Sequence, residues 1–401
     1  MGSHRGARVN DGASERRGRS AAGLAAVFAS TCLGLVSLFM FFPLLLFTLK
    51  GRGWSDAAVG GVASVEWLGL AVGAPFVSGW VRRMGLRRAF LLSGLLPFCA
   101  YLGITLTDWP ALWAVLIFGG GIAGSMRWIV AEASVAEMAA GASRGRTVGL
   151  FGTMISLTYI AGPALLAAVG TEGDAAERSR WTAVAIGGLG VLMGLRMPEL
   201  HSHHQAEGAA APRLGWRGIV DALRIAPLLL IAGALGGFYE AGSTGVLPLY
   251  GLALGLGSGM AALLVSACGL GGMLTMAPTG WLADRWPHRR LYLLASTATA
   301  LASLAMPLVP WWPPLAYVIA MAWGGTGGAL YTLAMADAGA RGTGVTLVNF
   351  TAVLVMSYTL GGVVAPLLGG LALSFAPGWG LPLLMTAVAC AGVVAVWRNR
   401  W

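Results

Sequence analysis

The chain has 401 residues, of which 57% are hydrophobic and only 10% are charged. A soluble protein of this length needs far more charge to cover its surface, so the composition excludes a soluble globular domain. Several apolar runs are long enough to cross about 30 Å of hydrocarbon, and the sequence therefore predicts an all-α membrane protein. The net charge of +10 does not indicate nucleic-acid binding, because the basic residues lie between the apolar runs.

The first 20 residues are polar and rich in arginine. We interpret residues 1–20 as a cytoplasmic tail that leads into an uncleaved first helix, because no short apolar core with a small-residue cleavage site is present. Twelve transmembrane helices are expected along the chain. They cover residues 21–49, 57–80, 88–106, 110–137, 147–169, 179–196, 225–252, 258–281, 289–309, 313–336, 345–373 and 378–397.

The longest polar interruption follows the sixth expected helix. It predicts an N-terminal six-helix bundle over residues 21–197, a cytoplasmic linker over 198–224 and a C-terminal six-helix bundle over 225–401. Four spans contain a proline that is expected to interrupt the helix, which membrane spans tolerate because neighbouring groups satisfy the freed carbonyls. These prolines are Pro43, Pro163, Pro248 and Pro366.

The basic residues predict the orientation. With both termini in the cytoplasm, 21 of the 26 basic residues fall in cytoplasmic segments and four fall in outside segments. The remaining one, Arg127, lies within a span. Such a bias sets the topology of membrane proteins, so both termini are expected in the cytoplasm.

Two loops between spans carry related sequences. Residues 280–290 read GWLADRWPHRR and residues 78–88 read SGWVRRMGLRR. Aligning Arg87 with Arg289 gives an offset of 202 residues (289 − 87), which is about half of the chain. This repeat indicates two halves that arose by duplication and share one architecture.

The second loop resembles the signature G-x-L-A-D-R-x-G-R-R of the major facilitator superfamily. The matching residues are Gly280, Leu282, Ala283, Asp284, Arg285 and Arg289. The first loop keeps Gly85, Arg87 and Arg88 but has Arg82 where the family usually has aspartate. The resemblance, to the twelve-helix bacterial type, implies two pseudo-symmetric six-helix bundles that rock around a central site. In the family, the first, fourth, seventh and tenth helices line that site.

Features of two subfamilies occur together, so the subfamily stays open. Gly162 and Pro163 are similar to a motif of the drug antiporters. An acid followed by arginines occurs twice, as in sugar-porter-like members, and Asp337 with Arg341 forms the second pair. The first pair consists of Glu137 with Arg144 and Arg146.

Three charged residues within spans are candidates for proton coupling or substrate binding. Glu240 lies in the middle of the seventh span and Glu66 within the second. A carboxylate in the membrane is disfavoured as the anion, so it can take up and release protons. The alternative is an acid that bonds a helix carbonyl or hydroxyl for structure. Arg127 in the fourth span needs a partner, and Glu66, Glu132 and Glu240 are candidates; a static packing pair is the alternative reading.

Aromatic residues of the spans are weaker candidates. Tyr239, Tyr331, Trp323 and Trp128 are expected to line the cavity, although an aromatic in a span more often serves packing or faces lipid.

The loop residues are expected to form a conformational latch. An aspartate at the membrane surface can accept hydrogen bonds from the N-terminus of a facing helix, and the resemblance implies helix five as the partner of Asp284. The alternative is a solvated turn. The residues assigned to the latch and its cytoplasmic network are Gly280, Asp284, Arg285, Arg289, Arg82, Arg83, Arg87, Glu132, Glu137, Arg144, Arg146, Asp337 and Arg341.

Neither a GxxxxGK[ST] nucleotide loop nor a GxSxG nucleophile motif occurs, so we expect no enzyme, no ATP-driven pump and no cofactor. His201, His203 and His204 are interpreted as a solvated loop and not as a metal site.

The sequence as a whole predicts a secondary active transporter of a small organic solute, with proton-coupled export by alternating access. Uptake or facilitated diffusion of a metabolite or sugar is one alternative, and a non-transporting receptor or lipid-handling protein is another. The expected partners are a small-molecule substrate, protons and the lipid bilayer, without nucleic acid. The resemblance implies a monomer that crosses the cytoplasmic (inner) cell membrane several times.

Overall fold

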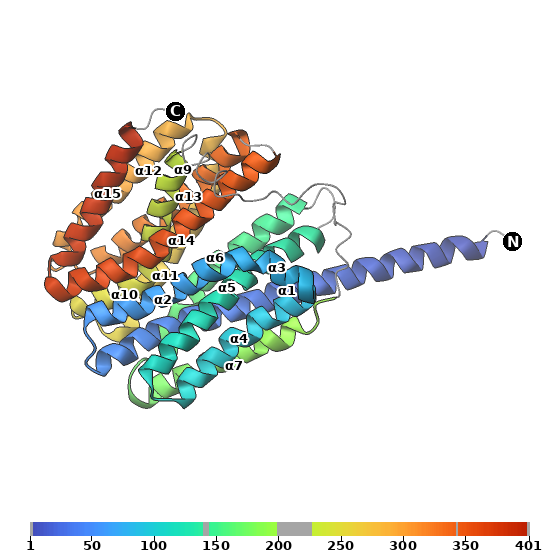
Figure 1. The fold of residues 1–401 in the computed structure, drawn as a ribbon, viewed down its shortest axis with the longest axis horizontal. Helices are drawn as coiled ribbons and strands as arrows, with labels where there is room; N and C mark the ends of the chain where they lie inside the picture. Colours follow the sequence, from blue (N-terminus) through green and yellow to red (C-terminus); the bar gives the residue numbers. More distant parts are fainter. Residues whose placement is uncertain (1–2, 139–143, 199–226, 342–343, 399–401) are drawn as a thin grey trace.

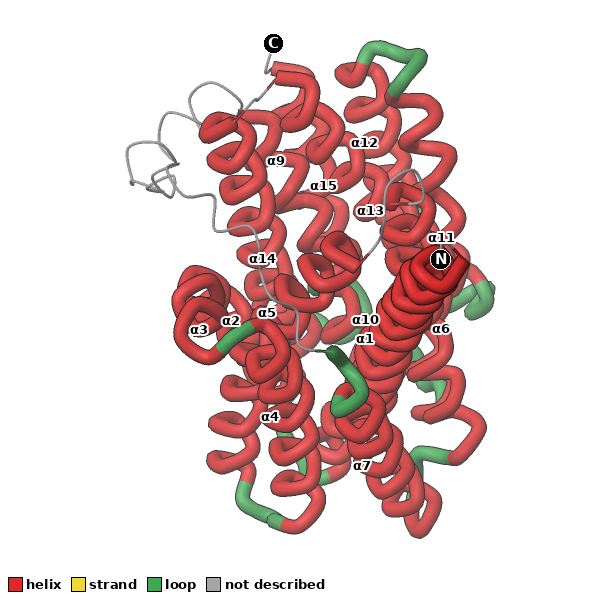
Figure 2. Tube along the Cα trace, turned by 90° about the vertical axis from the view of Figure 1, so that its right-hand side faces the viewer, coloured by secondary structure: helices red, strands yellow, loops and turns green. Residues whose placement is uncertain are grey.

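The computed structural model describes residues 3–138, 144–198, 227–341 and 344–398. Within these ranges the side chains of residues 3–21, 136–137, 144–146, 148–149, 339–341, 344–349 and 351–352 are not described. Every regular element of the described ranges is a helix, and short loops join the helices (Figure 2). The all-α prediction is therefore confirmed.

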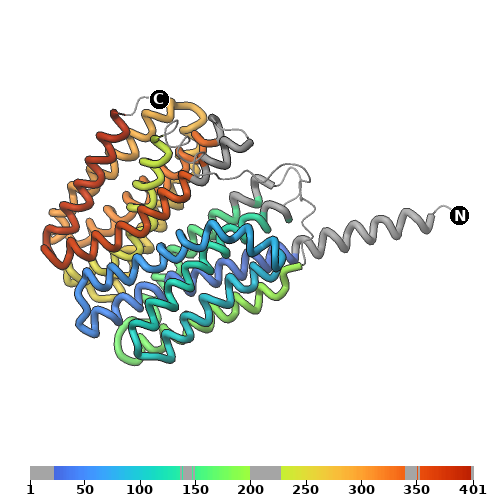
Figure 3. The backbone as a smooth tube through the Cα atoms, in the orientation of Figure 1, coloured from blue at the N-terminus to red at the C-terminus, as the bar shows by residue number. Residues whose placement is uncertain are grey.

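The helices form two bundles that lie side by side (Figures 1 and 3). The first bundle contains α1 (Ser3–Gly51), α2 (Asp56–Gly73), η1 (Ala74–Phe76), α3 (Val77–Met84), α4 (Leu86–Leu106), α5 (Pro110–Met138), α6 (Arg144–Val169) and α7 (Gly173–Gly194). The second contains α9 (Pro227–Gly236), η3 (Gly237–Ala241), α10 (Ser243–Ala253), α11 (Ser258–Ala283), α12 (His288–Leu304), η4 (Met306–Leu308), α13 (Leu315–Arg341), α14 (Gly344–Phe375) and α15 (Gly380–Arg398).

Ten of the described helical segments are long and apolar enough to cross a membrane. The sixth and seventh expected crossings do not fit this pattern, the sixth because of charged residues and the seventh because it is divided into shorter elements. Helix α7 carries Asp174, Glu177, Arg178 and Arg180 near its start. The seventh crossing is divided into α9, η3 and α10. With these two included, the fold is the twelve-helix, two-bundle arrangement that the sequence predicts.

The segments predicted outside the spans, the N-terminal tail and the linker, match the structure less directly than the spans do. Helix α1 begins at Ser3, so helical backbone includes most of the segment expected to be a tail. The predicted linker, 198–224, lies outside the described residues except for Pro198.

The positions of the helix breaks differ from the expectation. Pro43, Pro163, Pro248 and Pro366 all lie inside continuous helices. The second crossing instead tightens into the 3₁₀ turn η1, which contains Pro75. The seventh crossing widens into the π-helical turn η3, whose residues are Gly-Phe-Tyr-Glu-Ala. A π-helical turn inside an α-helix often marks a functional position, and this one contains Glu240.

The two bundles repeat one tertiary contact. The Arg87 guanidinium, at the start of α4, donates to the Leu195 carbonyl at the end of α7 across 3.1 Å. The Arg289 guanidinium, at the start of α12, donates to the Trp397 carbonyl at the end of α15, also across 3.1 Å. Both pairs are related by the offset of 202 residues that aligns the loops. The arginines satisfy last-turn carbonyls and complement the negative helix end.

We call the bundle ends that carry Gly85 and Asp284 the arginine-rich face, and the opposite ends, with residues 52–55, 170–172 and 255–257, the far face. Helix α2 packs on α14, and α6 packs on α11, so each pair joins the two bundles. Toward the far face α2 and α14 touch closely, because a Cβ at Gly60 would lie 2.9 Å from the Gly370 Cα.

Hydrogen bonds also join the bundles toward the far face. The Ala57 amide donates to the Ser374 hydroxyl across 2.8 Å, and the Ser266 hydroxyl donates to the Ile160 carbonyl across 2.9 Å. Toward the arginine-rich face the bundles diverge (Figure 1). The described contacts between the bundles therefore lie toward the far face, and the helices of the two bundles separate toward the arginine-rich face.

Candidate functional site

A cavity of about 340 Å³ lies between the two bundles. Residues of α1, α2, α5 and α6 line it from the first bundle, and residues of η3, α10, α11, α13 and α14 line it from the second. Most of the lining side chains are apolar or aromatic. A concave, mainly apolar site with a few polar groups is the usual form of a small-molecule binding site. The first, fourth, seventh and tenth crossings all contribute, together with four others.

Glu240 lines the cavity from the π-helical turn η3. Its carboxylate lies where glycines of α11 and α13 leave space for it. A Cβ at Gly328 would lie 3.4 Å from Glu240 Oε1, and a Cβ at Gly272 would lie 3.5 Å from the same oxygen. A Cβ at Gly327 would lie 3.0 Å from both the backbone nitrogen and the Cβ of Glu240. Small residues on two neighbouring helices thus make room for the widened turn and its carboxylate.

The Tyr358 hydroxyl donates a hydrogen bond to Glu240 Oε2 across 3.2 Å. Tyr358 belongs to α14, and its ring forms edge-on contacts with three other aromatic rings. The centroid distances are 6.3 Å to Trp67, 6.4 Å to Trp128 and 4.9 Å to Tyr331. Trp67 and Trp128 come from the first bundle, so this tyrosine joins the carboxylate of one bundle to the aromatic residues of the other.

Glu66 lines the same cavity from α2. The structure gives its carboxylate no hydrogen bond or ion pair with any described residue. Glu132 also lines the cavity, and it accepts a hydrogen bond from Trp128 Nε1 across 2.8 Å. The cavity therefore receives carboxylates from both bundles, and one of them has no partner among the described residues.

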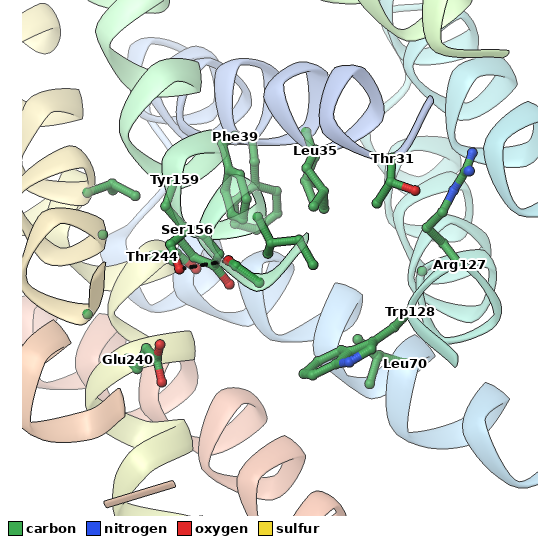
Figure 4. A pocket seen from close by; sticks show the side chains of 18 of the residues that line it. Thr31, Leu35, Phe39, Leu70, Arg127, Trp128, Ser156, Tyr159, Glu240 and Thr244 are labelled. Carbon is green, nitrogen blue, oxygen red and sulfur yellow. Dashed lines mark hydrogen bonds between the residues drawn. The ribbon is translucent and has the colours of Figure 1, made fainter. Parts of the chain in front are cut away.

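Arg127 lies on the side of the cavity opposite Glu240 (Figure 4). Its guanidinium donates to the Ser30 hydroxyl across 3.2 Å and lies 4.3 Å from the centroid of the Phe90 ring. A Cβ at Gly94 would collide with the same guanidinium. Among the described residues it makes no ion pair, so it is not paired with any of the three expected carboxylates. The Arg127 guanidinium therefore contacts only α1 and α4 of the first bundle through these described interactions.

Two aromatic residues expected in the cavity lie elsewhere. Tyr239 and Trp323 are fully buried in the second bundle and pack edge-on, with ring centroids 5.6 Å apart. The Tyr239 hydroxyl donates to the Met385 carbonyl. Trp323 Nε1 donates to the Ser303 hydroxyl across 3.1 Å. Neither residue is among those that line the cavity, whereas Tyr331 and Trp128 are.

The cavity is also lined by Trp67, Tyr159 and Tyr358, which were not among the residues expected there from the sequence. The available signal for Tyr358 was its position in a span between Ser357 and Thr359. A run of three hydroxyl side chains is unusual in an otherwise apolar helix.

The profile of the family described as Major Facilitator Superfamily matches residues 27–355. The chain belongs to the major facilitator superfamily.

Curated relatives carry the same family name. An MFS-type transporter of Yersinia pestis (strain Pestoides F) is 26% identical over 312 residues, which cover 77% of this chain and 78% of the relative. The MFS-type transporter YcaD of Salmonella newport (strain SL254) is 27% identical over 323 residues, with the same coverage. The names of both relatives describe them as uncharacterized and state no substrate.

Solved superfamily structures share the fold at low identity. The nucleoside transporter NupG superposes with a TM-score of 0.77 at 12% identity, covering 95% of this chain and 100% of that structure. A D-xylose-proton symporter gives 0.72 at 12% identity, with 94% and 96% covered. A bacterial homolog of the human lysosomal transporter Spinster, in an inward-facing and unoccupied conformation, gives 0.73 at 15% identity, with 94% and 95% covered. At these identities the likeness shows the fold alone.

The superfamily loop at residues 280–290 is solvated in this structure. Asp284 is exposed, and the structure gives it no side-chain hydrogen bond with a described residue. The Arg285 guanidinium lies 4.0 Å from the Trp281 ring centroid and donates to the Trp281 carbonyl. No described atom lies within 4 Å of a Cβ placed at Gly280. Asp284 therefore has no hydrogen bond with the described part of helix five, and the side chains of residues 144–146 and 148–149 at the start of that helix are not described.

Other latch residues bind within their own bundle. Asp337, 2% exposed, pairs with His288 Nδ1, whose ring also contacts the Ala283 carbonyl through Nε2 at 3.0 Å. Arg82 and Arg83 are exposed in the last turn of α3. The side chains of Glu137, Arg144, Arg146 and Arg341 lie outside the described part of the structure, as do His201, His203 and His204.

Proposed function

We propose that this superfamily transporter is a secondary active transporter of a small organic solute that works by alternating access and is coupled to protons. The observation that carries the proposal is the position of Glu66 and Glu240. One carboxylate comes from each bundle, and both line a cavity that lies between two halves in contact toward the far face. Such a site can be exposed to either side of the membrane if the halves rock.

The open side of the cavity is proposed to face the cytoplasm. The arginine-rich face carries the loops with most of the basic residues, and such loops remain on the cytoplasmic side. In this orientation both termini are cytoplasmic. The 198–224 linker, which joins the bundles at 21–197 and 225–401, is cytoplasmic as well. The exposure of Asp284 fits a cytoplasm-open state, because a latch on this face can close only when the two halves meet there.

Proton coupling is proposed to depend on Glu240 and Glu66. An ionised carboxylate in an apolar cavity is costly unless a cation, a proton or a hydrogen-bond donor compensates it. Tyr358 supplies one donor to Glu240, and Glu66 has none from the described residues. Protonation or a bound solute can supply the remaining compensation. A proton and the solute therefore compete for the carboxylates. Because one leaves when the other binds, solute and protons move in opposite directions, which supports export.

The test is solute-driven proton movement in proteoliposomes that contain the full chain and an internal pH-sensitive dye. Addition of a transported solute should move protons, and Glu240→Gln should abolish this movement. Glu177→Gln is the matched control, because Glu177 is an exposed acid of α7 outside the cavity. Solute flux that ignores the pH gradient would reject coupling and leave facilitated diffusion. Solute co-movement with protons would indicate uptake, and binding without any flux would indicate a receptor.

A further inference from the structure

We propose that the solute is an organic cation with an aromatic or otherwise apolar body, and this inference rests on the proposed function of the same cavity.

The cavity presents negative charge. Glu66, Glu132 and Glu240 line it, and Arg127 is the only basic residue that does so among the described residues. Arg127 is already occupied by Ser30 and the Phe90 ring, on the side away from Glu240. A cation that enters between the bundles would compensate Glu66 and Glu240, whereas an anion would meet two carboxylates without an available guanidinium.

The aromatic residues supply a surface for a cation and for its apolar body. The Tyr358 ring, whose hydroxyl meets Glu240, contacts the rings of Trp67, Trp128 and Tyr331 edge-on. Aromatic faces attract cations, most strongly where water is excluded. Because these rings come from both bundles, a cation held among them would contact both halves, and its release would follow when the halves separate.

The cavity offers a sugar-like solute much more apolar surface than hydrogen-bonding surface. The Ser156 hydroxyl donates to the Gly152 carbonyl, and the Thr244 hydroxyl donates to the Ala241 carbonyl, so both are used within their helices. Thr31 Oγ1 has no partner among the described residues, and the structure gives the Tyr159 and Tyr331 hydroxyls no hydrogen bond with a described residue. Because most of the lining is apolar, a solute with many hydroxyls would place several of them against apolar surface, and unpaired polar groups are costly.

Binding of two ions of equal shape and opposite charge tests the inference on the full chain in detergent. Tetraphenylphosphonium is the cationic probe and tetraphenylborate is the anionic one; equilibrium dialysis measures both. We expect the cation to bind at least tenfold more tightly than the anion. Glu240→Gln and Glu66→Gln should each weaken cation binding about tenfold, and Glu177→Gln should leave it unchanged. Because the two acids lie in different bundles, misfolding of one variant leaves the other as a test.

Equal or tighter binding of the anion, or cation binding that neither glutamine variant weakens, would overturn the inference. The proteoliposome assay separates this failure from failure of the proposed function. If a neutral or anionic solute drives proton movement and tetraphenylphosphonium does not compete with it, coupling stands and the cation inference fails. If the cation binds through Glu66 and Glu240 but no solute moves protons, the cation site stands and the coupling fails.

Discussion

The Tyr358 hydroxyl donates to the Glu240 carboxylate across 3.2 Å, and this contact connects α14 with the π-helical turn of the seventh crossing. Tyr358 also touches Trp67 and Trp128 of the other bundle. One side chain therefore contacts the carboxylate, the aromatic surface and both halves of the transporter.

Tyr358→Phe should keep the ring contacts and remove only the donor to Glu240. A hydrogen bond of this kind contributes about 1 kcal/mol, so we expect roughly a fivefold loss of solute-driven proton movement. Tyr101→Phe is the matched control, because Tyr101 stacks on Phe41 and does not line the cavity. An unchanged rate in the Tyr358 variant would remove the hydroxyl from the mechanism.

Gly327→Ala should impair transport although alanine favours helix by about 1 kcal/mol over glycine. The added Cβ would lie 3.0 Å from the backbone nitrogen and the Cβ of Glu240, so the widened turn must shift. We expect at least a tenfold loss of transport in protein that still elutes as one species. Gly119→Ala, in an open position of α5, should transport normally. Equal activity of both variants would contradict the close-packing argument.

A disulfide between Thr171→Cys and Ser258→Cys should hold the far face closed. The two hydroxyls lie 2.6 Å apart and belong to different bundles. In a background without the four native cysteines, oxidation should stop transport and reduction should restore it. Thr299→Cys with Thr326→Cys is the control pair, because these hydroxyls lie 2.8 Å apart within one bundle. Transport that continues through the oxidised cross-bundle pair would argue against rocking of the halves.

His288→Ala should destabilise the second bundle. The change leaves the Asp337 carboxylate, 2% exposed, without its imidazole partner, and such a loss costs about 1–3 kcal/mol. The measurement is the midpoint of thermal unfolding in detergent. Arg290→Ala, two residues further along α12 and exposed, should leave the midpoint in place. The same midpoint in both variants would show that the pair adds nothing to stability.

The sequence was sufficient for most of the fold because the apolar runs match the helices closely. The span expected at 110–137 is α5, Pro110–Met138, and the span expected at 258–281 is α11, Ser258–Ala283. The turn at Gly237–Ala241 was not predictable in this way. It depends on space that Gly272, Gly327 and Gly328 leave on two other helices, and periodicity along one segment does not contain that information.

The direction of side chains explains why part of the candidate site was predicted incorrectly. Adjacent residues of a helix point about 100° apart, so one of two neighbours can face a cavity while the other is buried within its own bundle. Glu240 faces it, and Tyr239 is buried against Trp323. Arg127 and Trp128 both line the cavity but point to different sides of it, toward Phe90 and toward Tyr358 respectively. Charge and residue type identify the candidate residues. Which of two adjacent candidates faces the cavity depends on how the helix is rotated about its axis, and the sequence does not give that rotation.

Arg87 and Arg289 each join the third crossing of a bundle to its sixth through a hydrogen bond to a backbone carbonyl. The ion pairs that the structure gives for the described residues, such as Arg52 with Asp108 and His288 with Asp337, likewise stay within one half. The contacts between the halves are instead hydrogen bonds of hydroxyl groups and close approaches between glycine backbones of the two bundles. Among the described residues, separating the halves breaks no ion pair, so the frequency of conformational exchange should depend little on ionic strength.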